Sequence, residues 1–414
     1  MDLKQQMRLL AERSRDAART LAKLDTATKN KLLVAMADGL ERSAEQIKTA
    51  NAKDIAAGRA AGLSSAVLDR LLLDDKRIAE MAKGIREVAA LDDPVGKTIS
   101  EWTRPNGIRI KKVRVPLGVI LIIYESRPNV TADAACLCFK TGNAVILRGG
   151  SEAIHSNLAI AEAMNVHGIP PDSITVVPTT DRAAVDELLK LDEFINLCIP
   201  RGGESLIRAV AEKSRIPVIK HYKGVCHVYV DREADLDMAE KIVVNAKCQR
   251  PAVCNAIETL LVDEKIADTF LPRIGKALAE RKVELRVDEA THHVLPGAKL
   301  ATEDDWYAEY LDLILAVRVV NGAGEAIEHI TKYGSAHSDA IVTKNKATAE
   351  KFLREVDSSS VFWNASTRLA DGGQYGFGAE IGISTDKLHA RGPMGLEELT
   401  SYKFVVVGDG QLRE

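Results

Sequence analysis

Two cysteines six positions apart, Cys248 and Cys254, stand in the stretch NAKCQRPAVCNAIETLLV, immediately before a run typical of a buried strand. Cys254 follows Gln249-Arg250-Pro251 in a predicted loop between a helix and a strand, and polar Asn255 comes next. An arginine and loop amides near a cysteine favour the thiolate, which is the nucleophilic form. Cys254 is therefore a candidate nucleophile, and a buried core cysteine is the alternative that the residues alone leave open.

The remaining cysteines show no pattern typical of metal binding or of a disulfide framework. Six cysteines are few for 414 residues, and most lie in apolar segments, which favours a reducing cytoplasm over a secreted scaffold. Cys136 and Cys138 lie two positions apart on a predicted helix and point about 200° apart, so they cannot share a metal ion. Cys248 and Cys254 are too far apart for a zinc knuckle. We predict a cytoplasmic protein without a metal site.

Two glycine pairs follow predicted strands and precede predicted helices, in ILRGGSEA and in CIPRGGESLIRAV. Backbone amides at the N-terminus of a helix form a natural site for phosphate, so each turn is a candidate cradle for a dinucleotide. Glycine pairs are also common at such turns for conformational reasons, and that alternative stays open.

Composition excludes several classes of function. A length of 414 residues predicts two or three packed units, and the net charge of −3 provides no basic face for nucleic acid. The longest apolar run, residues 115–124, is far short of the roughly 20 residues that span a membrane. The N-terminus lacks an apolar signal core. We expect neither nucleic acid nor a membrane as partner.

Most of the chain reads as an α/β protein. The first ninety residues are amphipathic helices, and EWTRPNGIRIKKVRVP predicts a polar hairpin arm with a type I′ turn at Asn106-Gly107. From residue 117 to 230 short apolar strands alternate with helices, up to the strand CHVYV, and a second cycle runs from 231 to 361. Such patterns predict parallel sheets covered on both faces, with ligands at the carboxyl ends of the strands.

Four segments together resemble the γ-glutamyl phosphate reductases, a family of the aldehyde dehydrogenase superfamily. They are VPLGVILIIYESRPNVTADAACLCFKTGNAVILRGGSEA, QRPAVCNAIETLLV, YGSAHSDAIVT and NASTRLADGGQYGFGAEIGISTDKLHARGPMGLEELTSYKFVVVG. The resemblance implies two Rossmann-like parallel-sheet domains plus a small β oligomerisation flap. It implies an NADP(H)-binding domain over 1–230 with the arm at about 100–116, and a catalytic domain over 231–362. Residues 363–385 would return to the cofactor domain, and 386–414 would form an oligomerisation segment.

The same resemblance implies NADPH-dependent reduction of L-glutamyl 5-phosphate to L-glutamate 5-semialdehyde, with release of phosphate, in proline biosynthesis. Cys254 would form a thioester, with Asn255 beside it in the site. The oxyanion would be held by the Cys254 amide and by a side chain of YESRPN, either Ser126 or Asn129. A homo-oligomer is expected, because the arm and the last strand leave an unpaired sheet edge. Glutamate 5-kinase is expected as the neighbour in the pathway.

The resemblance also implies which residues bind the ligands. The predicted cofactor residues are Arg148, Gly149, Gly150, Arg201, Gly202, Gly203, Glu204 and Glu309. Arg148 and Arg201 would suit a 2′-phosphate, which favours NADPH over NADH. The predicted substrate residues are Arg127, His337, Ser338 and Arg368. For Arg127 a surface salt bridge, and for His337 a structural role, are equally open.

Two alternatives remain. A hydrolytic or CoA-acylating semialdehyde dehydrogenase is disfavoured because IKHYKGVCHVYV offers Lys220, His221 and Lys223 but no glutamate to activate water on the thioester. An inactive enzyme-like scaffold is disfavoured by the intact Cys254 loop and the two glycine turns.

Overall fold

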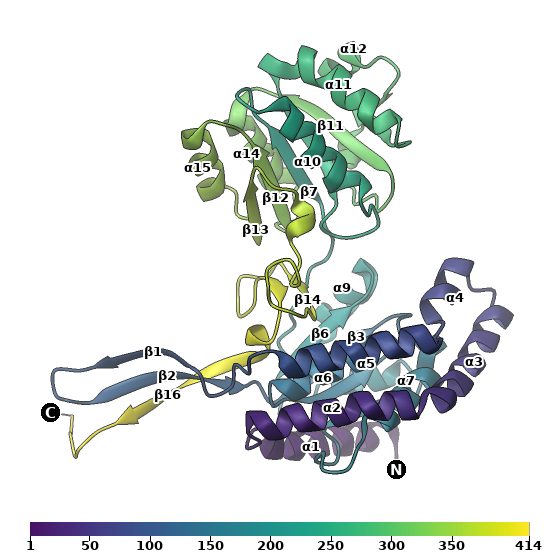
Figure 1. The fold of residues 1–414 in the computed structure, drawn as a ribbon, viewed down its shortest axis with the longest axis vertical. Coiled ribbons are helices and arrows are strands. Elements are labelled where there is room, and N and C mark those ends of the chain that lie inside the picture. The colour runs from purple at the N-terminus through teal and green to yellow at the C-terminus, as the bar shows by residue number, and fades with distance from the viewer. Residues whose placement is uncertain (414) are drawn as a thin grey trace. The chain divides into compact units, whose positions relative to one another are not determined.

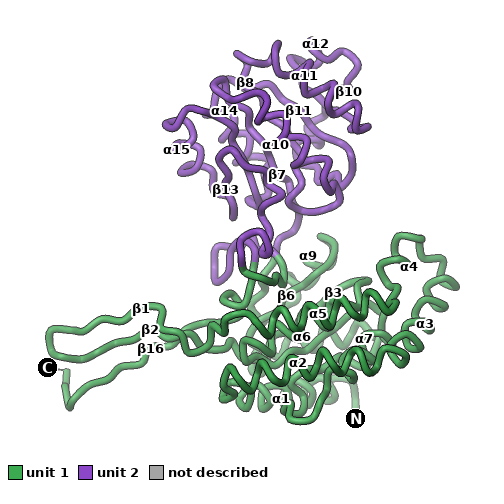
Figure 2. Tube along the Cα trace, viewed as in Figure 1, with its two compact units in different colours: residues 1–220, 377–382, 394–414 green, residues 221–376, 383–393 purple. Residues whose placement is uncertain are grey.

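The computed structural model describes residues 1–413, which divide into two compact units. Unit 1 comprises residues 1–220, 377–382 and 394–414, and unit 2 comprises residues 221–376 and 383–393 (Figure 2). The functional domain boundaries expected from the sequence, at 230, 362 and 385, do not coincide with the limits of these compact units. They stay a prediction.

The N-terminal part of unit 1 is helical, as its apolar periodicity predicts. The helices are α1 (Leu3–Leu21), α2 (Thr26–Arg42), α3 (Ala44–Ala60), α4 (Ser65–Leu71) and α5 (Asp75–Ala90) (Figure 1). The side chains of Asp2, Asp25 and Asp74 cap α1, α2 and α5 by accepting hydrogen bonds from backbone amides. Helix α2 packs against α5, and its buried face includes Leu33 and Met36.

A four-stranded parallel sheet forms the centre of unit 1. Its order is β5 (Ile174–Val176), β4 (Ala144–Arg148), β3 (Val119–Tyr124) and β6 (Leu197–Arg201). The accompanying helices are α6 (Asn129–Lys140), α7 (Ile154–Met164), α8 (Ala183–Leu188) and α9 (Glu204–Lys213). Strands β3 and β4 are buried along their whole length, which explains why they are continuously apolar in sequence.

A seven-stranded parallel sheet forms the centre of unit 2. Its order is β10 (Lys299–Leu300), β9 (Glu284–Val287), β11 (Ile314–Val320), β8 (Ile257–Asp263), β7 (Cys226–Val230), β12 (Ser338–Val342) and β13 (Ser360–Trp363). The helices are α10 (Leu236–Cys248), α11 (Ala267–Ala279), α12 (Glu289–Val294), α13 (Glu303–Trp306), α14 (Gly322–Tyr333) and α15 (Lys346–Glu355). The predicted α/β architecture with two parallel sheets is confirmed.

Strand β7 belongs to the larger sheet, although the sequence places CHVYV at the end of the first alternating stretch. Val228 of β7 pairs with Leu260 of β8 on one side and with Ala340 of β12 on the other. Alternation along the chain predicts that a strand exists. It does not predict which sheet the strand joins, because neighbours in sequence are not always neighbours in space.

The small antiparallel sheet predicted as a flap is present as an arm of β1 (Thr98–Thr103), β2 (Arg109–Pro116) and β16 (Thr400–Val407) (Figure 1). The predicted type I′ turn is wrong. The amide of Gly107 donates to the carbonyl of Arg104 at 2.9 Å, and only Gly107, with φ of 86°, has a positive φ in this turn. Pro105 therefore occupies the second position of the turn, where its fixed φ favours an ordinary β-turn.

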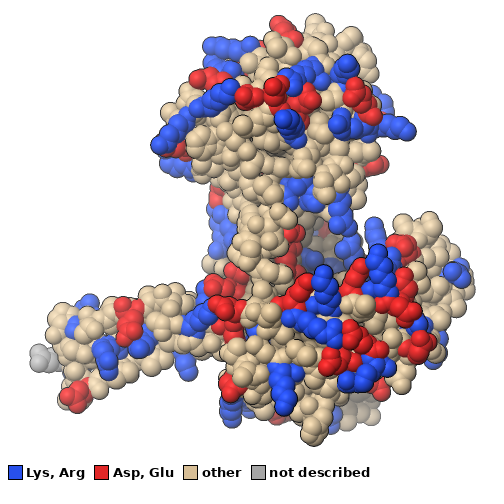
Figure 3. Space-filling model, in the orientation of Figure 1, with Lys and Arg blue, Asp and Glu red and all other residues tan. Residues whose placement is uncertain are grey.

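Basic and acidic side chains are interspersed on the face of the molecule drawn in Figure 3. Within residues 1–413, no helix combines the length and the apolar character needed to cross a membrane. In the same residues, no three or more His, Cys, Asp or Glu side chains are arranged to hold a metal ion. Two short strands before β16, namely β14 (Gly382–Ser384) and β15 (Gly392–Met394), form a two-stranded sheet.

Candidate active site

The candidate nucleophile Cys254 lies in the loop 249–256, between the end of α10 and the start of β8. Strands β7, β11 and β12 run parallel to β8, so the residues just before them lie at the same edge of the sheet. Gly224, Glu309 and His337 precede these three strands. The site residues of unit 2 thus lie at the amino-terminal edge of the sheet, whereas the strand-end rule predicts the carboxyl edge.

The backbone of Cys254 is held by the segment before β7. The Sγ of Cys226 donates to the carbonyl of Cys254 at 3.2 Å. A Cβ at Gly224 would overlap the same carbonyl, so only glycine allows this approach. The amide of Gly224 in turn donates to Oε1 of Glu309 at 2.8 Å. These contacts fix the position of the Cys254 main chain, while the Cys254 residue is only partly buried.

The residue after the nucleophile anchors the loop to the segment 366–370. The Nδ2 of Asn255 donates to the carbonyl of Ala370 at 2.9 Å, and the Oγ1 of Thr367 donates to the carbonyl of Asn255 at 2.7 Å. The guanidinium of Arg368 donates to Oδ1 of Asn255 and, at 2.9 Å, to Oε1 of Gln249. The predicted site residues Asn255 and Arg368 are therefore brought together around the loop that carries Cys254.

The guanidinium of Arg368 lies near the thiol of Cys254. Burial lowers the pKa of Arg368, the nearby charge of Arg250 lowers it further, and the attraction to Cys254 acts in the opposite direction. Arg368 and Cys254 are therefore close enough to interact electrostatically. A cation in this position stabilises a thiolate relative to the thiol, as nucleophilic cysteines require.

His337 and Ser338 are fully buried at the start of β12. The Nδ1 of His337 lies 2.9 Å from Oγ of Ser338 and 3.7 Å from Sγ of Cys226, and its ring packs edge-on against His221 at 5.7 Å. Burial, with a smaller contribution from His221, lowers the pKa of His337 to about 3. His337 is therefore a neutral side chain that packs behind Cys226, the residue whose Sγ contacts the carbonyl of Cys254.

Lys223 belongs to the segment before β7. Its ammonium donates to the carbonyl of Tyr307 at 2.9 Å.

In unit 1 the second glycine turn lies at the N-terminus of α9, directly after β6. The amide of Gly203 donates to Oε2 of Glu125 at 3.0 Å, and a Cβ at Gly202 would overlap the same carboxylate. Helix α9 has no side chain that caps its N-terminus, and Gly202 and Gly203 are exposed. An anionic group already interacts with this turn, as a phosphate would.

The first glycine turn follows β4. A Cβ at Gly149 would overlap the amide group of Asn157. The guanidinium of Arg148 is 8 % exposed and donates to the carbonyls of Gly149 and Thr180, the latter at 3.0 Å. Burial lowers its pKa, and its Nε has no hydrogen-bond partner among the described residues. Arg148 is thus placed beside the turn, with its charge largely satisfied by main-chain carbonyls.

The predicted oxyanion donors stand in the segment after β3. The amide and the hydroxyl of Ser126 both donate to Oε1 of Glu152, at 2.8 and 2.5 Å, and Ser126 has a φ of 40°. The Nδ2 of Asn129 donates to Oδ2 of Asp133 at 3.0 Å, and burial raises the pKa of Asp133 to about 6. Arg127, the candidate for the leaving phosphate, is exposed.

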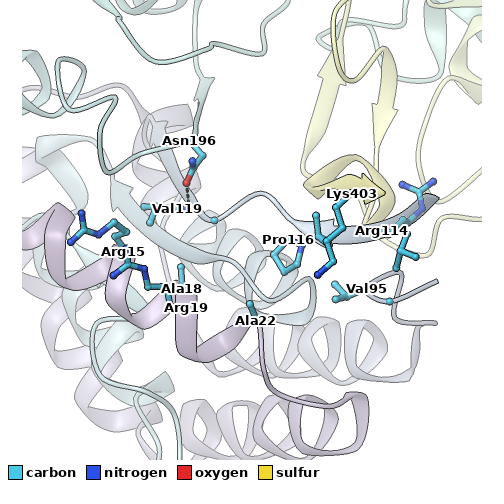
Figure 4. A pocket seen from close by; sticks show the side chains of 14 residues that line it. Arg15, Ala18, Arg19, Ala22, Val95, Arg114, Pro116, Val119, Asn196 and Lys403 are labelled. Atoms are coloured by element: carbon cyan, nitrogen blue, oxygen red, sulfur yellow. Dashed lines mark hydrogen bonds between the residues drawn. The ribbon is translucent and has the colours of Figure 1, made fainter. Parts of the chain in front are cut away.

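A cavity of about 640 Å³ lies at the base of the arm in unit 1, and none of the predicted site residues line it (Figure 4). The side chains of Arg15, Arg19, Arg114 and Lys403 surround it, together with apolar residues of α1 and β2. This cavity is therefore separate from the candidate catalytic residues.

Comparison with known proteins bears out the resemblance. The sequence profile described as "Aldehyde dehydrogenase family" matches residues 3–296. The chain belongs to the aldehyde dehydrogenase family. It is 60% identical to the γ-glutamyl phosphate reductases of Geotalea daltonii and Geobacter metallireducens, over the full length of both chains. A crystal structure of γ-glutamyl phosphate reductase from Thermotoga maritima has a TM-score of 0.97 at 48% identity, covering 99% of this chain and 100% of that one.

As an aldehyde dehydrogenase family member, the chain is an oxidoreductase, and the family uses a nicotinamide cofactor. The second glycine turn of unit 1 fits the phosphates of such a cofactor, because Gly202 and Gly203 are exposed and the N-terminus of α9 has no side-chain cap. The buried Nε of Arg148, which lacks a hydrogen-bond partner among residues 1–413, adds a donor beside the first turn.

Sequence reasoning missed several residues of this aldehyde dehydrogenase family member. Gly224 contacts the main chain of Cys254, and Glu125 and Glu152 contact the segments predicted to bind the cofactor and the oxyanion. Lys247 and Glu258 form an ion pair on either side of the Cys254 loop. For Lys247 and Glu258 the sequence did contain a signal, because each is a charged residue next to, or inside, an apolar run. A charged residue that is buried in such a run usually has a partner of opposite charge.

Proposed function

We propose that this chain reduces L-glutamyl 5-phosphate to L-glutamate 5-semialdehyde with NADPH and releases phosphate, as a step of proline biosynthesis. The substrate is inferred from the names of relatives that are 60% identical over their full length. The observation that carries the chemistry is the partly buried Cys254, in a loop bound to neighbouring segments on both sides and close enough to Arg368 to interact with its charge.

In the first step the Cys254 thiolate attacks the acyl carbon of glutamyl phosphate. A carbon–sulfur bond forms, and the carbon–oxygen bond to phosphate breaks with its electron pair leaving on the phosphate. A thiolate is a suitable nucleophile because phosphate is a good leaving group. Arg250 and Arg368 stabilise the thiolate before the attack, and Arg127 is the candidate that binds the departing phosphate.

A nicotinamide dinucleotide held at the glycine turns would supply a hydride to the thioester carbonyl. The resulting oxyanion needs donors that are already in place, and the amide of Cys254 with Ser126 or Asn129 are the candidates. When this tetrahedral species collapses, the carbon–sulfur bond breaks, the aldehyde leaves and the Cys254 thiolate is regenerated.

The remaining ligand contacts belong to the same proposal. The glycine turns would hold the phosphates, with Glu204 at the start of α9. Arg148 and Arg201 would contact the 2′-phosphate that distinguishes NADPH from NADH. Glu309 would bind the nicotinamide ribose. Arg368 would bind the amino-acid end of the substrate, and Asn255 would lie beside Cys254 in the site. His337 and Ser338, which are fully buried, would support the substrate site from behind.

A hydrolytic aldehyde dehydrogenase is the second candidate, and one observation bears on it. The carboxylate of Glu309 lies next to the Cys254 loop through its hydrogen bond with Gly224, although the sequence offers no glutamate in residues 219–230. That hydrogen bond occupies Oε1 of Glu309, which favours a structural role over activation of water.

The proposal also includes the setting of the enzyme. It would be a homo-oligomer in the cytoplasm, supplied with acyl phosphate by glutamate 5-kinase.

The test is oxidation of glutamate semialdehyde by NADP, measured with and without phosphate, for the wild type and Cys254→Ala. The proposal predicts turnover that requires phosphate and a loss of activity in Cys254→Ala. Turnover without phosphate would favour the hydrolytic alternative, and substantial turnover by the alanine variant would contradict the thioester.

A further inference from the structure

A buried ion pair joins the two ends of the loop that carries Cys254. Lys247 lies near the end of α10, and Glu258 is the second residue of β8. The Nζ of Lys247 is 2.6 Å from Oε2 of Glu258, and both side chains are 0% exposed. Removing two charges from water carries a large desolvation penalty, and a pair of apolar residues would often be at least as stable. Stability alone is therefore a poor explanation for this pair.

The second oxygen of Glu258 binds a different loop. The amide of Leu311 donates to Oε1 of Glu258 at 3.2 Å. Leu311 has a φ of 53°, a backbone conformation that a leucine adopts only when its surroundings enforce it. Its side chain is 43% exposed, so apolar packing does not enforce that conformation. The hydrogen bond to Glu258 is the contact that holds Leu311 in place.

The Leu311 loop also carries Glu309, whose Oε1 accepts the amide hydrogen bond of Gly224. Gly224 in turn packs against the carbonyl of Cys254. The contacts therefore form a closed circuit, from Lys247 to Glu258, from Glu258 to Leu311, and from Glu309 through Gly224 back to Cys254. Three separate segments, 223–226, 248–258 and 307–313, are fixed relative to one another by this circuit.

We propose that Glu258 is a positioning residue, which sets the Cys254 loop in register with the Glu309 loop through the amide of Leu311, and that Lys247 balances its buried charge. The proposal rests on Cys254 being the nucleophile, as argued above. Lys247 pairs with Oε2 of Glu258, and Oε1 accepts the hydrogen bond from Leu311. Neither residue contacts the substrate.

The charges around the pair agree with this role. Burial raises the pKa of Glu258 to about 7, and the nearby Glu309 adds to that effect, while Lys247 lowers it. A carboxyl group in this position keeps its acceptor oxygen for Leu311 whether or not it carries charge. The hydrogen bond, rather than the charge, is therefore the feature that the loops depend on.

Two double variants separate the hydrogen bond from the charge. In Lys247→Met/Glu258→Gln the pair is neutral and the amide oxygen can still accept from Leu311. In Lys247→Met/Glu258→Met the pair is apolar and the acceptor is lost. The readout is the rate of alkylation of Cys254 by iodoacetamide, followed by peptide mass spectrometry. This measurement uses neither substrate nor dinucleotide, so it stands even if the proposed reaction is wrong. Thermal unfolding is recorded for every variant.

We expect the Gln-containing variant to alkylate at nearly the wild-type rate. The Met/Met variant should be slower by about tenfold or more, because a displaced Cys254 loses the nearby charge of Arg368 that stabilises its thiolate. Its melting temperature should equal or exceed that of the Gln-containing variant, since apolar replacement of a buried pair is commonly tolerated. Arg232→Met, which removes the ion pair with Asp263 at the other end of β8, is the control and should leave the rate unchanged.

A third variant covers the case in which the Met/Met protein does not fold. Leu311→Pro changes an exposed side chain, removes the amide hydrogen that Glu258 accepts and cannot adopt the positive φ, so the loop leaves the position that Glu258 selects. We expect slower alkylation and a higher KM for NADPH from this variant in a protein that still unfolds cooperatively. Wild-type alkylation in either the Met/Met or the Leu311→Pro protein, or rates in the series that follow melting temperature alone, would overturn the proposal.

Discussion

At the scale of residues, the nucleophile could be predicted, but most of the residues that position it could not. Cys254 stands out because it lies in a predicted loop with Arg250 nearby. Gly224 lies thirty positions earlier, and its closeness to Cys254 results from the pairing of β7 with β8. A single sequence contains no local signal for such a contact.

Gly224→Ala is therefore expected to displace the Cys254 main chain, because the new Cβ would overlap the Cys254 carbonyl. We expect the catalytic rate to fall by about 100-fold, because a displacement near 1 Å can cost that much. The alkylation rate should also fall, since the thiolate moves relative to Arg368. Gly324→Ala in α14 is the matched control, since a Cβ there meets no atom within 4 Å. Equal rates in the two variants would contradict the contact described here.

His337 predicts a specific dependence of stability on pH. Burial lowers the pKa of its folded-state imidazole from 6.5 to about 3, so the folded chain stays neutral where the unfolded chain takes up a proton. The contribution of His337 to stability is complete above pH 6.5 and is lost as the pH falls. Between pH 6.5 and 5 the loss should be about 2 kcal/mol.

The measurement is the free energy of unfolding in urea at pH 7 and pH 5, for the wild type and His337→Asn. The variant should lose about 2 kcal/mol less than the wild type over this interval. Asp133 and Glu258, whose pKa values burial raises to about 6 and about 7, titrate in the same interval and affect both proteins equally. His293→Asn, at an exposed position, is the control, and identical pH dependence in all three proteins would refute the role of His337.

At the scale of elements, the hydrophobic pattern predicted most helices and strands, because their periodicity is local. It failed where the answer depended on pairing. Strand β7 was placed with the wrong sheet, and the arm turn was predicted from Asn106-Gly107 without weighing Pro105. The arm illustrates a further case: its hairpin looks polar on both faces until β16 adds aromatic side chains to one of them.

That face of the arm carries Trp102 and Phe404, whose rings lie 6.2 Å apart, and Tyr402, which packs against Phe404. Trp102, Tyr402 and Phe404 are all exposed. Exposed aromatic clusters of this kind are typical of interfaces, which supports the predicted homo-oligomer. Phe404→Glu should shift the molar mass measured by light scattering toward a single chain. The control Arg109→Glu lies on the opposite face of the arm and should leave the molar mass unchanged. An unchanged molar mass in both variants would count against an interface at the aromatic face.

At the scale of the whole molecule, the sequence predicted two parallel-sheet units and an arm, and the structure has them. The limits of the compact units were less predictable, because the tail contributes residues 377–382 and 394–414 to unit 1 and residues 383–393 to unit 2. Short segments that return to an earlier unit have no periodicity of their own. The two units supply different parts of the proposed chemistry, the nucleophile from unit 2 and the phosphate-binding turns from unit 1.

The central claim is that Cys254 carries the acyl group. The direct measurement is a rapid-mixing experiment with glutamate semialdehyde and NADP in the absence of phosphate. The account predicts a burst of NADPH equal to the number of active sites, followed by slow turnover. Protein quenched with acid should carry one glutamyl group on the peptide containing Cys254. Phosphate added to the native enzyme before the quench should remove that group. A burst without a modified Cys254 peptide, or the same modification on Cys226 or Cys248, would contradict the account.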